Sequence, residues 1–91
     1  MLPVPFFPVP GMSNVKARCT ASNDNKLGQT GGTSPGDCAG ACHATAGCEF
    51  FSFADGCDEC WLFDSCAQTD SGPGWVYTWS SYGLHKTAQS N

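Results

Sequence analysis

Residues 34–54 read SPGDCAGACHATAGCEFFSFA, and this stretch decides the fold. Ser34 can cap a helix whose first residue is Pro35, and Asp37 completes a capping box. Gly47 is suited to end that helix, because glycine adopts a left-handed backbone conformation without steric cost. The sequence therefore predicts a helix of about three turns that starts at Pro35 and stops at Gly47.

A strand is predicted directly after the helix. Residues 48–54, CEFFSFA, are rich in aromatic residues of high β propensity. Side chains alternate along a strand, so Phe51 and Phe53 should lie on one face, and Phe50 and Ser52 on the other.

Further strands are expected on both sides of this centre. Asp55 and Gly56 form a typical hairpin turn. Residues 21–34 are polar and rich in glycine, and are expected to be a loop. The other expected strands are 15–20 (VKARCT), 59–64 (ECWLFD) and 75–80 (WVYTWS). The expected fold class is α+β, with one helix packed on a short antiparallel sheet and only one face of that sheet covered.

The two ends of the chain differ from its centre. In residues 2–10, proline alternates with apolar residues, so the arm of residues 1–14 is expected to be extended and close to polyproline II. An apolar arm needs something to cover it, either its own domain or a partner. Residues 15–82 are expected to form the domain, and residues 83–91 a polar tail.

Composition restricts the class of protein. The chain has 91 residues, seven cysteines and a net charge of −4. A domain this small gains stability from disulfides, which form in oxidising compartments. We therefore expect an extracytoplasmic location: secreted, at the cell surface or in an oxidising organelle lumen. The acidic balance predicts no nucleic-acid binding. Apolar runs are far shorter than the roughly 18 residues of a spanning helix, which predicts no membrane insertion.

Three segments together resemble the PAN/apple domain family. They are DCAGACHATAGCEFFSF, CWLF and GWVYTW, which follow one another within residues 34–80. In that family a helix with a Cys-x-x-x-Cys pair precedes a strand opened by a cysteine, then a Cys-x-Leu strand and a closing aromatic strand. The resemblance implies a small disulfide-rich binding module of the kind found in clotting zymogens and in surface proteins.

The resemblance also implies two disulfides. By position, Cys42 would pair with Cys48, and Cys38 with Cys60. Both fit the predicted elements, because Cys38 and Cys42 are four residues apart and so share one face of the helix. Each bridge would contribute about 2–4 kcal/mol of stability.

Three cysteines remain after these two pairs. Our preferred third pair is Cys19 with Cys66, which leaves Cys57 unpaired or available for an intermolecular bridge. Two alternatives stay open: Cys57 could pair with Cys66, or could replace Cys60 as the partner of Cys38.

No catalytic residue, cofactor or metal site is expected. Cys57 and Cys60 have the spacing of redox and zinc sites, which makes a small zinc or redox domain the second alternative function. Three nearby carboxylates disfavour a reactive thiolate there, and the chain lacks recognisable machinery for nucleophilic catalysis. We therefore expect that the protein is not an enzyme.

Aromatic and apolar residues beyond the needs of a small core are candidates for partner binding. Ordinary packing in the core is the competing explanation for them. The candidates are Leu2, Val4, Phe6, Phe7 and Val9 in the arm, and Trp61, Trp75, Tyr77 and Trp79 in the domain. The expected function is a non-catalytic protein-interaction module, a small structural or accessory subunit docked onto a larger assembly. The first alternative is a carbohydrate-binding adhesion module.

Overall fold

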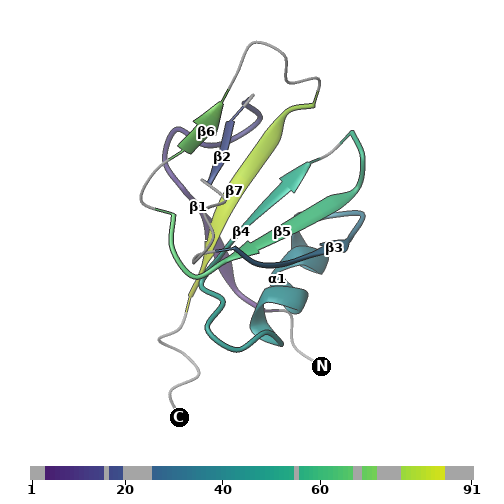
Figure 1. Cartoon of the computed structure of the whole chain (residues 1–91), viewed down its shortest axis with the longest axis vertical. Helices are drawn as coiled ribbons and strands as arrows, with labels where there is room; N and C mark the ends of the chain where they lie inside the picture. Colours follow the sequence, from purple (N-terminus) through teal and green to yellow (C-terminus); the bar gives the residue numbers. More distant parts are fainter. Residues whose placement is uncertain are drawn as a thin grey trace.

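The computed structural model describes residues 4–15, 17–19, 26–54, 56–66, 69–71 and 77–85. Within these ranges one helix lies against an antiparallel sheet, which confirms the predicted α+β fold class (Figure 1). The elements are β1 (Phe6–Pro8), β2 (Ala17–Cys19), β3 (Lys26–Gly31), α1 (Pro35–His43), β4 (Phe50–Ala54), β5 (Glu59–Phe63), β6 (Thr69–Ser71) and β7 (Trp79–Leu84).

The main sheet has five strands in the order β1-β7-β4-β5-β3. Its centre is β4, where Phe51 lies opposite Leu62 of β5 and Tyr82 of β7. A separate two-stranded sheet joins β2 to β6, beside β7 and away from the helix (Figure 1). The sheet therefore has more strands than the sequence predicts.

Helix α1 begins as predicted but its first turn is bonded differently. Ser34 caps the helix and accepts a hydrogen bond from the Asp37 N–H at 3.3 Å. The Asp37 carboxylate accepts from the N–H and the hydroxyl of Thr33, both at 2.9 Å, instead of reaching the Ser34 N–H of a capping box. These hydrogen bonds from Thr33 lower the pKa of Asp37 below its ordinary value of 3.8.

The prediction that the helix runs to Gly47 is wrong by one turn. The helix ends at His43, with Ala44 as its C-cap. A turn follows, in which the Cys48 N–H donates to the Thr45 carbonyl at 3.1 Å. Gly47 still has the expected left-handed conformation, with φ of 82°. The early stop brings Cys48 back beside the last turn of the helix.

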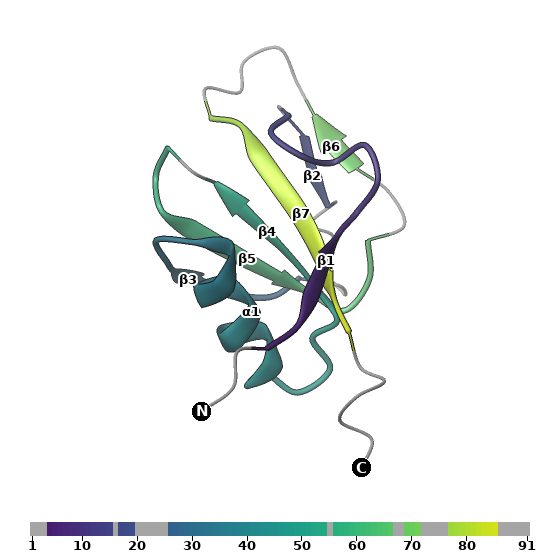
Figure 2. The same cartoon turned by 180° about the vertical axis from the view of Figure 1, so that it is seen from behind.

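One face of the sheet packs on the helix, as Figure 2 shows from behind. Phe51 and Phe53 lie on this face and are buried, as the alternation predicts. The remaining members of this core are Cys38, Ala39, Cys42, Cys48, Cys60, Leu62 and Leu84.

The opposite face of the sheet is covered in part by β2, so the expectation that only one face is covered is wrong. Ser52 and Ser81 are fully buried there, with their hydroxyls 2.7 Å apart. The Cys19 N–H of β2 points at Ser52 Oγ from 3.4 Å. Phe63 on this face is also fully buried. The sheet is therefore packed on both faces.

The N-terminal arm is part of the fold. β1 pairs with β7, so that Phe6, Phe7 and Pro8 lie opposite Leu84, Gly83 and Tyr82. The arm is extended as predicted, but as a β-strand on its own domain. An outer strand tolerates a proline such as Pro8, because only one side of such a strand needs hydrogen-bond donors.

Several predicted boundaries need correction. β3 lies within the range 21–34 that was predicted to be loop, and β6 lies where no strand was expected. The last strand starts at Trp79, so Tyr77 and Thr78 precede it, and it continues through Leu84 into the expected tail. Residues 75–76 and 86–91 lie outside the described residues.

Candidate binding surface

Three disulfides join the described elements. Cys38–Cys60 ties the helix to β5, with Cα atoms 5.5 Å apart. Cys42–Cys48 links the helix to the turn that follows it, and Cys19–Cys66 closes the β2 side of the domain. These are the two pairs that the resemblance implied and the third pair that we preferred.

Cys57 is left as an exposed free thiol in the turn between β4 and β5. Partial burial, and then the charges of Glu59 and Asp58, raise the pKa of the Cys57 thiol. Cys60, its neighbour in the Cys-x-x-Cys spacing, is fully buried and bonded to Cys38. The arrangement is therefore not that of a redox dithiol. The described residues also contain no cluster of three or more metal-ligating side chains.

A polar and aromatic cluster lies on the face of the sheet away from the helix. We call Arg18, Gln29, Glu59 and Trp61 the Trp61 patch. The Arg18 guanidinium carbon lies 3.9 Å from the centroid of the Trp61 ring. The Glu59 carboxylate accepts a hydrogen bond from Trp61 Nε1 at 2.9 Å and another from Gln29 Nε2 at 2.8 Å. The patch thus holds a partly exposed tryptophan in a defined orientation.

The register of the sheet explains why these side chains meet. Gln29 of β3 and Trp61 of β5 are direct cross-strand partners, and Glu59 lies two residues before Trp61 on the same face. Arg18 arrives from β2, held over the sheet by its neighbour Cys19. Three separate strands therefore build the patch.

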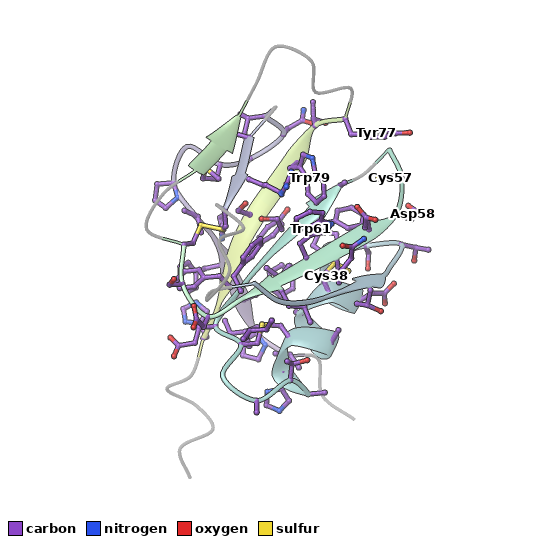
Figure 3. The ribbon with its side chains drawn as sticks, viewed as in Figure 1. Cys38, Cys57, Asp58, Trp61, Tyr77 and Trp79 are labelled. Carbon is purple, nitrogen blue, oxygen red and sulfur yellow. A yellow bond between two sulfur atoms is a disulfide. The ribbon has the colours of Figure 1, made fainter. Side chains whose placement is uncertain are left out.

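Trp79 of β7 packs beside Trp61 on the same face of the sheet. Its ring meets the Trp61 ring edge to face, with centroids 5.7 Å apart. Because Trp79 is only 6% exposed, the expectation that it contributes to an exposed binding surface needs correction. Figure 3 shows the two tryptophans close together on the sheet, with Tyr77 and Cys57 toward the end that carries the β4–β5 turn.

Tyr77 is the most exposed large apolar side chain of the described residues, at 45%. One side of its ring rests on Gly56, where a Cβ atom would collide with the ring. Tyr77 therefore retains an accessible surface at the end of the sheet. Trp75, the other aromatic candidate, lies outside the described residues.

Of the arm residues that were candidates for partner binding, some pack against the domain and others are exposed. Val4 and Phe6 pack against the helix-side core, and Val9 is half-buried. Phe7 is 36% exposed and its ring lies 4.9 Å from that of His85. Leu2 lies outside the described residues.

Sequence reasoning missed Arg18, Gln29 and Glu59 as members of the surface. Arg18 lies in an expected strand and Gln29 in an expected loop, so no local pattern connects either of them to Trp61. The only local signal was Glu59, which is two residues from Trp61 and so shares its face of a strand.

The fold and the disulfides define a small α+β module held together by three disulfides, with no assembled catalytic group among the described residues. A family model of the PAN domain matches residues 14–84, which is most of the chain. The protein belongs to the PAN domain family. Searches of curated proteins and of solved structures returned no significant match.

Family membership agrees with the chemistry of the chain. PAN domains are generally non-catalytic modules that bind proteins or carbohydrates, and they are typically extracellular. The three disulfides fit an oxidising environment. No helix among the described residues has the length and apolar character needed to cross a membrane.

Proposed function

We propose that this protein is an extracytoplasmic, non-catalytic protein-binding module, a small accessory or structural subunit that contacts a larger assembly through the Trp61 patch. The observation that carries the proposal is the stacking of the Arg18 guanidinium on the Trp61 ring, at 3.9 Å. Tryptophan, tyrosine and arginine are the residue types that dominate the energetics of protein interfaces.

The arrangement of the patch supports binding because its side chains are already ordered. Ordering a flexible side chain at an interface costs about 0.5–1.5 kcal/mol. Here Glu59 holds both Trp61 and Gln29 by hydrogen bonds, and the Arg18 guanidinium lies over the rings of both Trp61 and Trp79. The side chains of the patch therefore lost their conformational entropy on folding, and a partner does not have to order them.

A protein partner is favoured over a sugar at this patch. Sugars stack on an open aromatic face, but the Arg18 guanidinium lies over the ring of Trp61. A second candidate function, carbohydrate binding, is favoured by Tyr77 instead, because this ring is 45% exposed.

Retention of a partner by immobilised protein tests the proposal. We compare the parent chain with three variants, Trp61→Ala, Arg18→Ala and Tyr77→Ala. The control is His43→Ala, because His43 is exposed on the helix, on the other side of the sheet from the patch. The extracellular fraction of the native source supplies the partner. The proposal expects a protein that the parent and His43→Ala retain and that Trp61→Ala loses by at least about tenfold.

Two outcomes decide against this patch. Equal retention by Trp61→Ala and the parent, with both chains folded by circular dichroism, contradicts the proposal. Binding of the parent to a glycan array that is lost only in Tyr77→Ala supports the carbohydrate function in its place.

A further inference from the structure

Residues 4–9 of the N-terminal segment, which we call the arm from here on, lie against a complementary surface of the domain that we call the seat. The Phe6 ring packs edge to face against Phe51 and Tyr82, with centroid distances of 5.7 and 5.3 Å. On the opposite face of the sheet, the Phe7 ring crosses Gly83 so closely that a Cβ atom at position 83 would come within 2.5 Å of Phe7 Cζ. The seat is therefore complementary to an extended segment with two adjacent phenylalanines.

Nothing covalent fastens the arm to this seat. All three disulfides join residues between Cys19 and Cys66. The match to the PAN domain also begins at residue 14, beyond the arm. Since Pro5, Pro8 and Pro10 carry no N–H, they cannot donate hydrogen bonds to β7. The arm is thus attached to the disulfide-bonded domain only by its β-sheet pairing with β7 and by side-chain packing.

The link between arm and domain contains two residues with left-handed backbone. They are Gly11, with φ of 77°, and Asn14, with φ of 54°. Between them Met12 is buried, and its carbonyl accepts from the Ser81 N–H at 2.8 Å. Met12 can therefore stay anchored while Gly11 supplies the freedom to redirect residues 4–9.

We propose that the arm is an exchangeable strand, and that the seat of one copy accepts residues 4–9 of a second copy in a reciprocal, strand-swapped dimer. Exchange repeats the contacts already present in the monomer, so no new complementary surface is needed. Residues 1–11 carry no charged side chain, so the exchanged segment brings no repulsion between two acidic chains. This inference does not depend on the Trp61 patch.

The monomer should prevail in dilute solution. A tethered arm has an effective concentration of the order of millimolar at its own seat. A second copy competes only when its concentration approaches that value, or when one arm is disabled. The second condition gives a direct test.

The test uses two full-length variants, both with Cys57→Ser so that no intermolecular disulfide can form. Phe6→Ala disables the arm and leaves the seat open. Gly83→Val fills the seat, where the added side chain meets Phe7 and Phe50, and leaves the arm intact. By analytical ultracentrifugation each variant alone should be a monomer. Their mixture should give a one-to-one dimer in which the arm of the Gly83→Val copy occupies the seat of the Phe6→Ala copy, which is one half of the reciprocal exchange. Folded variants that remain monomers when mixed would overturn the proposal.

Hydrogen exchange on the unmodified protein keeps the proposal testable if a variant does not fold. The Val9 N–H donates to Ser81 O at 2.9 Å, and the His85 N–H to Pro5 O at 3.1 Å. If the arm leaves its seat while the domain stays folded, these two amides exchange at least about tenfold faster than the amide of buried Phe51. Equal protection of all three amides would show that the arm is released only on global unfolding, and would contradict exchange.

Discussion

The backbone of Gly32 lies against the sulfur of Cys60, so closely that a Cβ atom on residue 32 would come within 2.8 Å of Cys60 Sγ. The same Cβ would lie 3.1 Å from the Cβ of Asp37. Both neighbours are fixed, Cys60 by its disulfide to Cys38 and Asp37 by the first turn of the helix. The glycine thus allows the chain to pass over the disulfide.

Gly32→Ala should therefore destabilise the protein by about 1–3 kcal/mol, the usual cost of overpacking. The matched control is Gly40→Ala, because no atom lies within 4 Å of a Cβ built on this exposed helical residue. That change should stabilise the fold by up to about 1 kcal/mol. Denaturant unfolding of both variants measures the two free energies, and a similar effect of both substitutions would contradict the packing over Cys60.

The buried serine pair predicts non-additive effects. Ser52 and Ser81 share a hydrogen bond of 2.7 Å on the sheet face covered by β2. Either Ser→Ala change should cost about 1–3 kcal/mol, because it leaves a buried hydroxyl without its partner. The double variant should cost less than the sum of the two. Unfolding free energies in a double-mutant cycle check this, and strict additivity would argue against the pair.

The lowered pKa of Asp37 predicts that the free energy of unfolding depends on pH. Hydrogen bonds from Thr33 hold the pKa of Asp37 below 3.8 in the folded state. Because the folded pKa is the lower one, the stabilisation is present above 3.8 and is lost as the pH falls through the folded pKa. Asp37→Asn should therefore be less stable than the parent at pH 6, and the difference should shrink toward pH 2. A difference that stays constant over this range would contradict the role of the charge.

The free thiol of Cys57 predicts selective but slow alkylation. Iodoacetamide should modify this cysteine alone in the folded protein, because the other six cysteines are in disulfides. Partial burial and the charges of Glu59 and Asp58 raise the pKa of Cys57, so the midpoint of the pH–rate profile should lie above 9.0. Peptide mass mapping and the pH–rate profile measure these two properties. Labelling of any other cysteine in the folded chain would contradict the disulfide pairing.

Local patterns predicted the centre of this fold. The Ser34-Pro35 start, the spacing of Cys38 and Cys42 and the alternation in β4 each depend on neighbouring residues. The outer strands could not be predicted in this way. β3 contains two glycines and is a strand only because it pairs with β5, and β1 contains a proline and is one because it pairs with β7.

The Trp61 patch was predicted only in part for a similar reason. Trp61 and Tyr77 could be named because they are large and aromatic. The position of Arg18 depends on β2 crossing the sheet, and the burial of Trp79 depends on what covers it. Both follow from contacts between residues far apart in the sequence, which no local pattern records.

The affinity for the retained partner tests the central claim most directly. Calorimetry with the purified partner should be carried out on the parent chain, Trp61→Ala and the control His43→Ala. We predict that Trp61→Ala weakens binding by at least about tenfold, or roughly 1.4 kcal/mol, and that His43→Ala has no measurable effect. Equal affinities of the parent and Trp61→Ala would contradict a role for the Trp61 patch in binding.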